Sequence, residues 1–186
     1  MTLEFWNTVA AWGTFTVIAA TAIAAVVQLN HMRHSNQLGG LLTTFGILQD
    51  PALRDLINYV RHDLQANMKD DVYRRSLLDT PVDRAKHPEF YIIDVYNHIG
   101  AFLRGGLIDE EIYMRTEWYN VRLYWNLLVE PIAIRRTLNP YVFENFEYLA
   151  ARAEAWVAKH PKGDYPPTER RLELPAVPDV LNVTAM

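Results

Sequence analysis

The chain has 186 residues, with 18 Lys and Arg against 22 Asp and Glu, a formal net charge of −4 and no cysteine. A nucleic-acid-binding surface needs clustered basic residues, so this weakly acidic composition predicts no nucleic-acid partner. The lack of cysteine excludes disulfides, iron–sulfur clusters, thiolate zinc sites and cysteine nucleophiles.

The first element is an uncharged apolar segment. No Asp, Glu, Lys or Arg occurs from Phe5 to Met32, and only Gly and Thr interrupt the apolar residues from Val9 to Val27. A helix of about 20 residues crosses a hydrocarbon core about 30 Å thick. A helix buried in a water-soluble domain seldom lacks charge on every side over such a length. We therefore predict a transmembrane anchor over residues 5–29, with Trp6 and Trp12 near the lipid headgroups.

A cleavable signal peptide is the alternative for this segment. A signal begins with basic residues, whereas the start of this chain carries Glu4 and no Lys or Arg. Ala22 and Ala24 form an imperfect cleavage-like pattern, so the alternative stays open. The first basic residue is Arg33, directly after the predicted span. The positive-inside rule then places the body in the cytoplasm and the N-terminus outside.

Residues 30–160 carry apolar side chains at helical spacing and predict one helical domain. Asp50 followed by Pro51 predicts a capped helix start. A strongly apolar helix is predicted from about Pro88 to Arg104, ended by the pair Gly105 and Gly106.

Two further helices follow in the prediction. Asp109 resembles an N-cap, and the helix after it is expected to kink or break at Pro131. Asn139-Pro140 then restarts the chain into a helix whose apolar face begins at Tyr141. Residues 161–186 hold half of the chain's prolines and predict an extended or disordered Pro-rich tail. The predicted fold class is all-α: a transmembrane helix, a small irregular bundle and this tail.

Three stretches resemble a known family: "MTLEFWNTVAAWGTFTVIAATAIAAVVQLNHMRHSNQL", "NHIGAFLRGGLIDEE" and "ENFEYLAARAEAWVAKHPKGDYP". They are similar to short bacterial single-pass membrane proteins that form a domain-of-unknown-function family. The resemblance implies an N-terminal anchor and a helical domain in the bacterial inner membrane, and it supplies no activity or cofactor. One departure is Asn30, where the family tends to carry Arg.

Residues with catalytic potential are few. Asp94 and His98 stand four apart on one predicted helix, so the carboxylate could orient the imidazole. Glu144 and Glu147 could suggest a carboxylate metal cluster, but the Glu-x-x-His pairs of a bundle di-metal site are absent from the sequence. A polar surface pair and a solvated face are the favoured interpretations. We therefore predict no catalytic residue, no cofactor and no metal.

The candidate interaction residues fall into three groups. Small side chains at i, i+4 and i+8 predict a face of the span that packs on another transmembrane helix or a second copy. Arg33 can contact lipid phosphates, and aromatic residues on the predicted helix after Asp109 can form an interface patch. The residues of the first group are Thr16, Ala20 and Ala24; those of the third are Trp118, Tyr119, Tyr124 and Trp125.

These observations favour a membrane-anchored helical interaction protein, an accessory or scaffolding subunit of a larger membrane assembly. Its partners would be the lipid bilayer and another transmembrane protein or a second copy. The alternative is a membrane-tethered enzyme, or a stress or defence effector, with an unrecognised active site. The missing catalytic signatures favour the first function.

Overall fold

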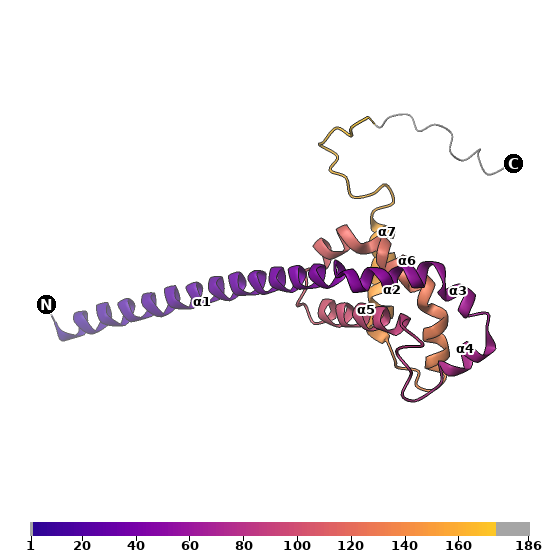
Figure 1. Cartoon of the computed structure of the whole chain (residues 1–186). Helices are drawn as coiled ribbons and strands as arrows, with labels where there is room; N and C mark the ends of the chain where they lie inside the picture. Colours follow the sequence, from indigo (N-terminus) through magenta and orange to yellow (C-terminus); the bar gives the residue numbers. More distant parts are fainter. Residues whose placement is uncertain (1, 174–186) are drawn as a thin grey trace.

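The computed structural model describes residues 2–173, and within this range the chain forms seven helices and no strand (Figure 1). The prediction of an all-helical chain led by a long apolar helix is therefore confirmed. The helices are α1 (Leu3–Leu48), α2 (Pro51–His62), α3 (Leu64–Asn67), α4 (Asp71–Ser76), α5 (Glu89–Arg104), α6 (Glu110–Arg136) and α7 (Glu144–Lys159).

α1 is a single helix of 46 residues that serves two environments. Figure 1 shows its N-terminal part projecting away from all other helices. Large apolar side chains there are exposed, among them Phe15 at 64% and Ile23 at 66%. Its last turns join the bundle, where Leu41 and Thr44 are buried. One helix therefore links the apolar segment to the packed domain without a hinge loop.

Aspartate caps begin three of the helices. The Asp50 carboxylate accepts a hydrogen bond from the Ala52 backbone amide at 2.8 Å, and Asp109 accepts one from Ile112 at 3.0 Å. Asp70 plays the same part for α4. Each carboxylate satisfies a backbone N–H that has no partner inside its helix. The predicted caps at Asp50 and Asp109 are confirmed.

The end of α5 is a Schellman motif. Gly106 has a φ of +70°, and its amide donates to the Leu103 carbonyl oxygen at 3.0 Å. The Leu107 amide donates to the Phe102 carbonyl oxygen at 2.9 Å. Only glycine adopts this left-handed conformation at little steric cost. The predicted helix stop at Gly105 and Gly106 is therefore confirmed.

Two details of the later helices differ from the prediction. Of the kink or break predicted at Pro131, the break is wrong, because α6 continues through this buried residue to Arg136. α7 begins at Glu144 rather than near Tyr141, which is 73% exposed. The Asn139 side chain accepts a hydrogen bond from the Tyr141 amide at 3.0 Å. This turn competes with helix formation and delays the start of α7.

The core lies where α5 packs against α6 and α7. Tyr96 of α5 stacks on Phe146 of α7 at a ring separation of 5.2 Å, and Trp125 of α6 meets the same ring edge-on at 5.2 Å. A side chain at Gly100 would collide with the Asn145 backbone carbonyl, so α5 and α7 cross at close range there. This crossing holds the centre of the bundle.

A second close approach joins α1 to the α5–α6 loop. A Cβ atom on Gly40 would lie 2.6 Å from the Leu107 carbonyl oxygen, closer than real Cβ contacts come. Gln37 Nε2 donates to the Gly106 carbonyl oxygen at 3.2 Å in the same junction. By contrast, a Cβ atom on Gly39 would have nothing within 4 Å. Of these two adjacent glycines, the contact requires only Gly40.

The first part of the predicted tail, residues 161–173, is exposed. Arg115 of α6 donates to the Asp164 carboxylate at 2.6 Å, which ties the start of this segment to the bundle. The rest of the predicted Pro-rich tail, residues 174–186, lies outside the described residues.

The two glycines give a matched test of the junction. Gly40→Ala should lower the free energy of unfolding by about 1–3 kcal/mol, because the new methyl group displaces the α5–α6 backbone. Gly39→Ala should raise it by about 0.5–1 kcal/mol, because alanine favours an exposed helix. Thermal unfolding of the full chain in detergent, followed by circular dichroism, measures both. Equal effects of the two substitutions would show that α1 does not pack tightly on the loop.

Candidate functional site

The small residues predicted to pack in a membrane lie along the exposed part of α1. Thr16, Ala20 and Ala24 are all solvent-exposed, and the Thr16 hydroxyl donates to the Trp12 carbonyl oxygen of its own helix at 2.8 Å. Helical geometry places Gly13 on the same face, and a Cβ atom added to it would meet no other part of the chain within 4 Å. Thr16, Ala20 and Ala24 thus form a narrow row of small side chains over about two turns, with the exposed Val17 beside it four residues after Gly13.

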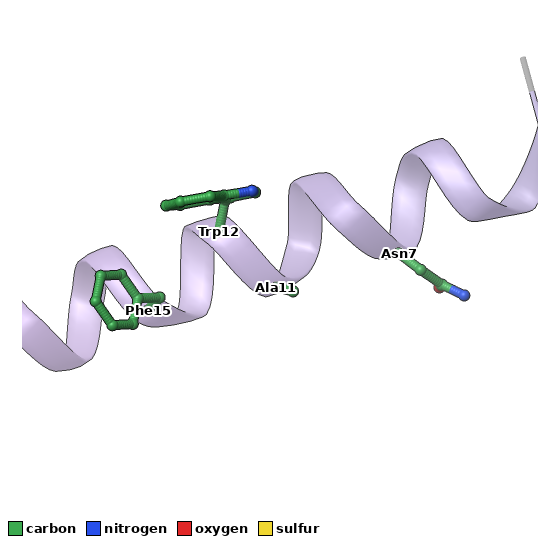
Figure 2. Close-up of a pocket in the computed structure, with 4 residues that line it drawn as sticks. All are labelled: Asn7, Ala11, Trp12 and Phe15. Atoms are coloured by element: carbon green, nitrogen blue, oxygen red, sulfur yellow. The ribbon is translucent and has the colours of Figure 1, made fainter.

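The apolar surface near the start of α1 comes from one helix. Figure 2 shows Asn7, Ala11, Trp12 and Phe15, all projecting from α1. Trp12 meets Phe15 edge-on at 6.1 Å. No other described element faces these residues, so they form open helix surface rather than a cleft.

The predicted aromatic patch is divided between core and surface. Tyr124 is only 3% exposed, and Trp125 packs on Phe146 as described above. Tyr119 is 59% exposed, and Trp118 meets it edge-on at 5.8 Å while Arg122 lies over the indole at 6.0 Å. Only Trp118 and Tyr119 therefore remain as candidates for an exterior aromatic contact.

The Asp94–His98 pair is not formed. Asp94 instead accepts a hydrogen bond from Arg84 at 2.6 Å, and His98 is exposed. Glu147 pairs with Arg136 at 2.8 Å. Within residues 2–173, no group of three or more His, Asp or Glu side chains could hold a metal ion.

A different set of polar residues meets inside the bundle, around the carboxylate of Glu89. Glu89 and His87 are both fully buried. Glu89 Oε1 accepts from the Tyr73 hydroxyl at 2.8 Å and lies 3.1 Å from His87 Nδ1. His87 Nε2 lies 2.8 Å from the Ser76 hydroxyl. Ser76, His87 and Glu89 thus stand in the order of a hydrolase triad.

The other arm of this buried network runs through two more residues. The Tyr59 hydroxyl lies 2.8 Å from that of Tyr73, and Asn67 Nδ2 donates to Tyr59 at 3.0 Å. Because Tyr73 has one proton and gives it to Glu89, Tyr59 must donate to Tyr73. Burial, the Tyr59 bond and the Glu89 charge all raise the pKa of Tyr73, which therefore stays a neutral donor. The bonds connect α2, α3 and α4 to the start of α5.

The proton of Ser76 has two acceptors within reach. Its oxygen lies 2.8 Å from the Tyr73 carbonyl oxygen and 2.8 Å from His87 Nε2. A hydroxyl has one proton, so it can satisfy only one of them. When Ser76 donates to His87, the ring is neutral and its Nδ1–H faces Glu89. When Ser76 donates to the carbonyl, Nε2 can remain bonded only if it carries a proton itself.

Burial restricts what this network can do chemically. A serine hydrolase needs an exposed nucleophile and hydrogen-bond donors aimed at the developing oxyanion. A surface hollow of about 420 Å³ adjoins His87, lined by Leu56, Arg84, Pro88 and Tyr91, yet neither the His87 nor the Glu89 side chain has any exposed surface. A substrate therefore has no path to the imidazole in this conformation. The geometry fits a buried hydrogen-bond network that holds helices together better than it fits a catalytic centre.

A second perturbed carboxylate lies beside the α1 junction. Glu117 borders a small cavity of about 130 Å³, together with Phe45, Tyr96 and Tyr124. Burial raises the pKa of Glu117, opposed by the hydrogen bond it accepts from Asn120 at 3.0 Å. None of the residues that line this cavity is a cation that could compensate the ionised form. Glu117 is thus held at a cost to stability when charged.

The sequence offered little warning of the buried network. Its members lie at irregular intervals along the chain and belong to four helices and a loop. The only local signal is His87-Pro88-Glu89, two titratable residues flanking a proline just before an apolar helix. Nothing in their spacing indicates that both are buried, because burial depends on where α2 and α4 pack.

Fold and site together define an all-helical domain that is carried on a long apolar helix and stabilised by a buried carboxylate network. The family model described as "Domain of unknown function (DUF4760)" matches residues 15–153, and the chain belongs to that family. No curated protein and no solved structure matches the chain. The matched region starts inside α1 and ends inside α7, so the apolar helix and the bundle are parts of one family unit.

A structural role for the Glu89 network predicts that substitutions of two tyrosines change the free energy of unfolding by very different amounts. Tyr73→Phe should lower the free energy of unfolding by about 1–3 kcal/mol, because it leaves a buried carboxylate and the Tyr59 hydroxyl short of a partner. Tyr91→Phe, at a 50% exposed position on α5, is the matched control and should have almost no effect. Chemical denaturation of both variants measures the difference. Similar small effects would mean that the network does not hold the helices together.

The Glu117 environment predicts a pH-dependent stability change. An acid whose pKa is raised by folding destabilises the protein above that pKa, and the cost disappears as the pH falls toward the ordinary glutamate pKa of 4.5. Glu117→Gln should therefore raise the melting temperature at pH 7, with a gain that shrinks toward pH 4. Glu144→Gln, in the exposed first turn of α7, should slightly lower it at pH 7 because the helix dipole favours a negative charge there. A gain from Glu117→Gln that persists unchanged at pH 4 would contradict the assignment.

Proposed function

We propose that the protein is a single-pass membrane protein of the bacterial inner membrane that holds a helical interaction domain beside the bilayer. Its body lies in the cytoplasm, and it serves as an accessory or scaffolding subunit of a larger membrane assembly. The proposal rests above all on α1, a helix long and apolar enough to cross a membrane.

The exposure of α1 supports the anchor. None of its most apolar 18-residue window is buried against the rest of the chain. Exposed apolar area of this extent is unfavourable in water and favourable in hydrocarbon, at roughly 25 cal/mol per Å². A core helix of a soluble domain would bury such a stretch. The span also continues into the packed domain through Leu41 and Thr44, as expected for an anchor that remains in the mature protein.

The burial of the triad-like polar groups and the exposure of the small residues on α1 favour an interaction role over catalysis. Ser76, His87 and Glu89 are the residues that most resemble a catalytic site. The imidazole and the carboxylate of this set are fully buried in the bundle. The exposed face of Gly13, Thr16, Ala20 and Ala24, by contrast, suits close contact between helices in lipid. Leucine chains and lipid tails are equally apolar, so small residues that allow backbone approach favour association there.

Bulky substitutions on opposite faces of the span test this role. Ala20→Leu with Ala24→Leu should leave the protein in membranes after an alkaline wash, because leucine favours insertion. The same variant should lose most of its copurifying membrane partner or its crosslinks between copies. Ala22→Leu with Ala25→Leu, on the opposite face of α1, is the control and should retain the assembly.

Two results would count against the proposal. Release of the unmodified protein by the alkaline wash would remove the anchor. Equal retention of the assembly by both double variants would remove the helix-packing face.

A further inference from the structure

We propose that the cavity beside Glu117 is a binding site for a small primary ammonium ion, that is, a protonated amine with a short alkyl chain. The site lies where the end of α1 meets α2, α5 and α6. It goes beyond the scaffolding role proposed above, because it assigns a ligand to the helical domain itself and does not depend on the membrane anchor.

The cavity has the size and the lining that a short alkyl chain needs. Its volume of about 130 Å³ is close to that of an engineered apolar cavity of about 150 Å³ that binds benzene. Phe45 and Leu48 of α1 line it together with Ile57 of α2. Tyr96 and Tyr124, whose ring centroids lie 5.4 Å apart, line it as well. An alkyl chain placed among these side chains is removed from water at little polar cost.

Glu117 supplies the charge that selects a cation. Its Oε2 accepts a hydrogen bond from Asn120 at 3.0 Å, and its Oε1 accepts none within residues 2–173. One carboxylate oxygen is therefore available to a ligand. The side chain is half-buried, and burial raises its pKa because the ionised form loses hydration. An ammonium group that donates to Oε1 compensates this loss, whereas an anion is repelled.

The groups around the cavity do not supply the cation themselves. Arg61 donates to the Tyr124 hydroxyl at 2.7 Å and forms no ion pair with Glu117 within the described range. Tyr113 precedes Glu117 by about one turn of α6, and its buried hydroxyl has no hydrogen-bond partner among residues 2–173. The Tyr113 ring stacks on that of Phe45 at 6.4 Å. Burial and the Glu117 charge raise the pKa of this phenol, which stays neutral and is available as a second acceptor.

Binding of an ammonium ion reverses the effect of Glu117 on stability. In the free protein the half-buried charge lacks a compensating cation and is held at a cost. In the bound protein the same charge holds a cation at a site partly removed from water, where Coulomb attraction is stronger than in bulk water. Glu117 thus has opposite effects on the free and the bound protein, and one substitution separates them.

The experiment uses the full chain in a neutral detergent at pH 7. The probe is n-butylammonium chloride, and n-butanol is its uncharged counterpart of similar length. Each is added at about 10 mM and constant ionic strength, and the melting temperature is followed by circular dichroism. A ligand that binds only the folded state with a Kd of about 1 mM raises the melting temperature by about 3–5 °C at this concentration.

Butylammonium should produce this rise, and butanol should produce less than about half of it. Glu117→Gln, which is expected to melt higher without the probe, should lose at least about four-fifths of the rise. Glu144→Gln removes an exposed carboxylate of α7 and is the matched control, which should keep the rise.

Three results would overturn the ammonium site: no rise with butylammonium in the unmodified protein, an equal rise with butanol, or an equal rise in the Glu117→Gln variant. The first two need no variant, so they decide the matter even if a substitution impairs folding. None of the three affects the anchor, which the alkaline wash tests separately.

Discussion

The continuity of α1 is the constraint on which the rest of the structure depends. A helix of 46 residues has a fixed rise and rotation per residue, so its exposed apolar half and its packed half cannot reorient independently. Leu41 and Thr44 fix the face of α1 that packs on the bundle. They therefore also fix the direction in which each face of the exposed apolar part points relative to the bundle. A flexible linker between the two halves would remove this coupling.

The junction between α1 and the bundle depends on backbone more than on side chains. Gly40 lets α1 approach the Leu107 carbonyl group, and the left-handed Gly106 turns the chain so that this carbonyl faces α1. Both glycines act through the absence of a side chain. Gly40 leaves room for the carbonyl group, and Gly106 adopts the left-handed conformation. The α5–α6 loop is therefore held at a defined height along α1, level with Gln37 and Gly40.

The buried Glu89 network has a different role in the bundle. A carboxylate removed from water is costly unless hydrogen bonds compensate it. His87 and Tyr73 both contact Oε1 of Glu89, and its buried Oε2 has no hydrogen-bond partner within residues 2–173. Tyr73 is itself bonded to Tyr59, and Tyr59 to Asn67. The network therefore links α2, α3 and α4 to the start of α5. A triad-like order of groups is thus compatible with a structural role, since burial rather than residue identity decides whether a substrate can reach the imidazole.

Local rules predicted much of the secondary structure, because caps and stops depend on neighbouring residues. Asp50 and Asp109 bind amides two and three residues away, and Gly106 ends its helix within one turn. A local contact also explains why the predicted helix start near Tyr141 was wrong. The Asn139 side chain accepts a hydrogen bond from the Tyr141 amide, and this turn replaces the first helical turn. The resemblance of three stretches of sequence to a domain-of-unknown-function family agrees with the DUF4760 match over residues 15–153.

The sequence by itself determined the uncharged apolar length of α1, its helical body and the caps, since each follows from composition or from contacts within a few residues. Only the tertiary structure decided that Glu89, His87 and Tyr73 share one buried site, that Asp94 pairs with Arg84 rather than His98, and that Gly40 rather than Gly39 is required. Those facts depend on how helices distant in the chain pack together, and no local pattern encodes the distance between two helices.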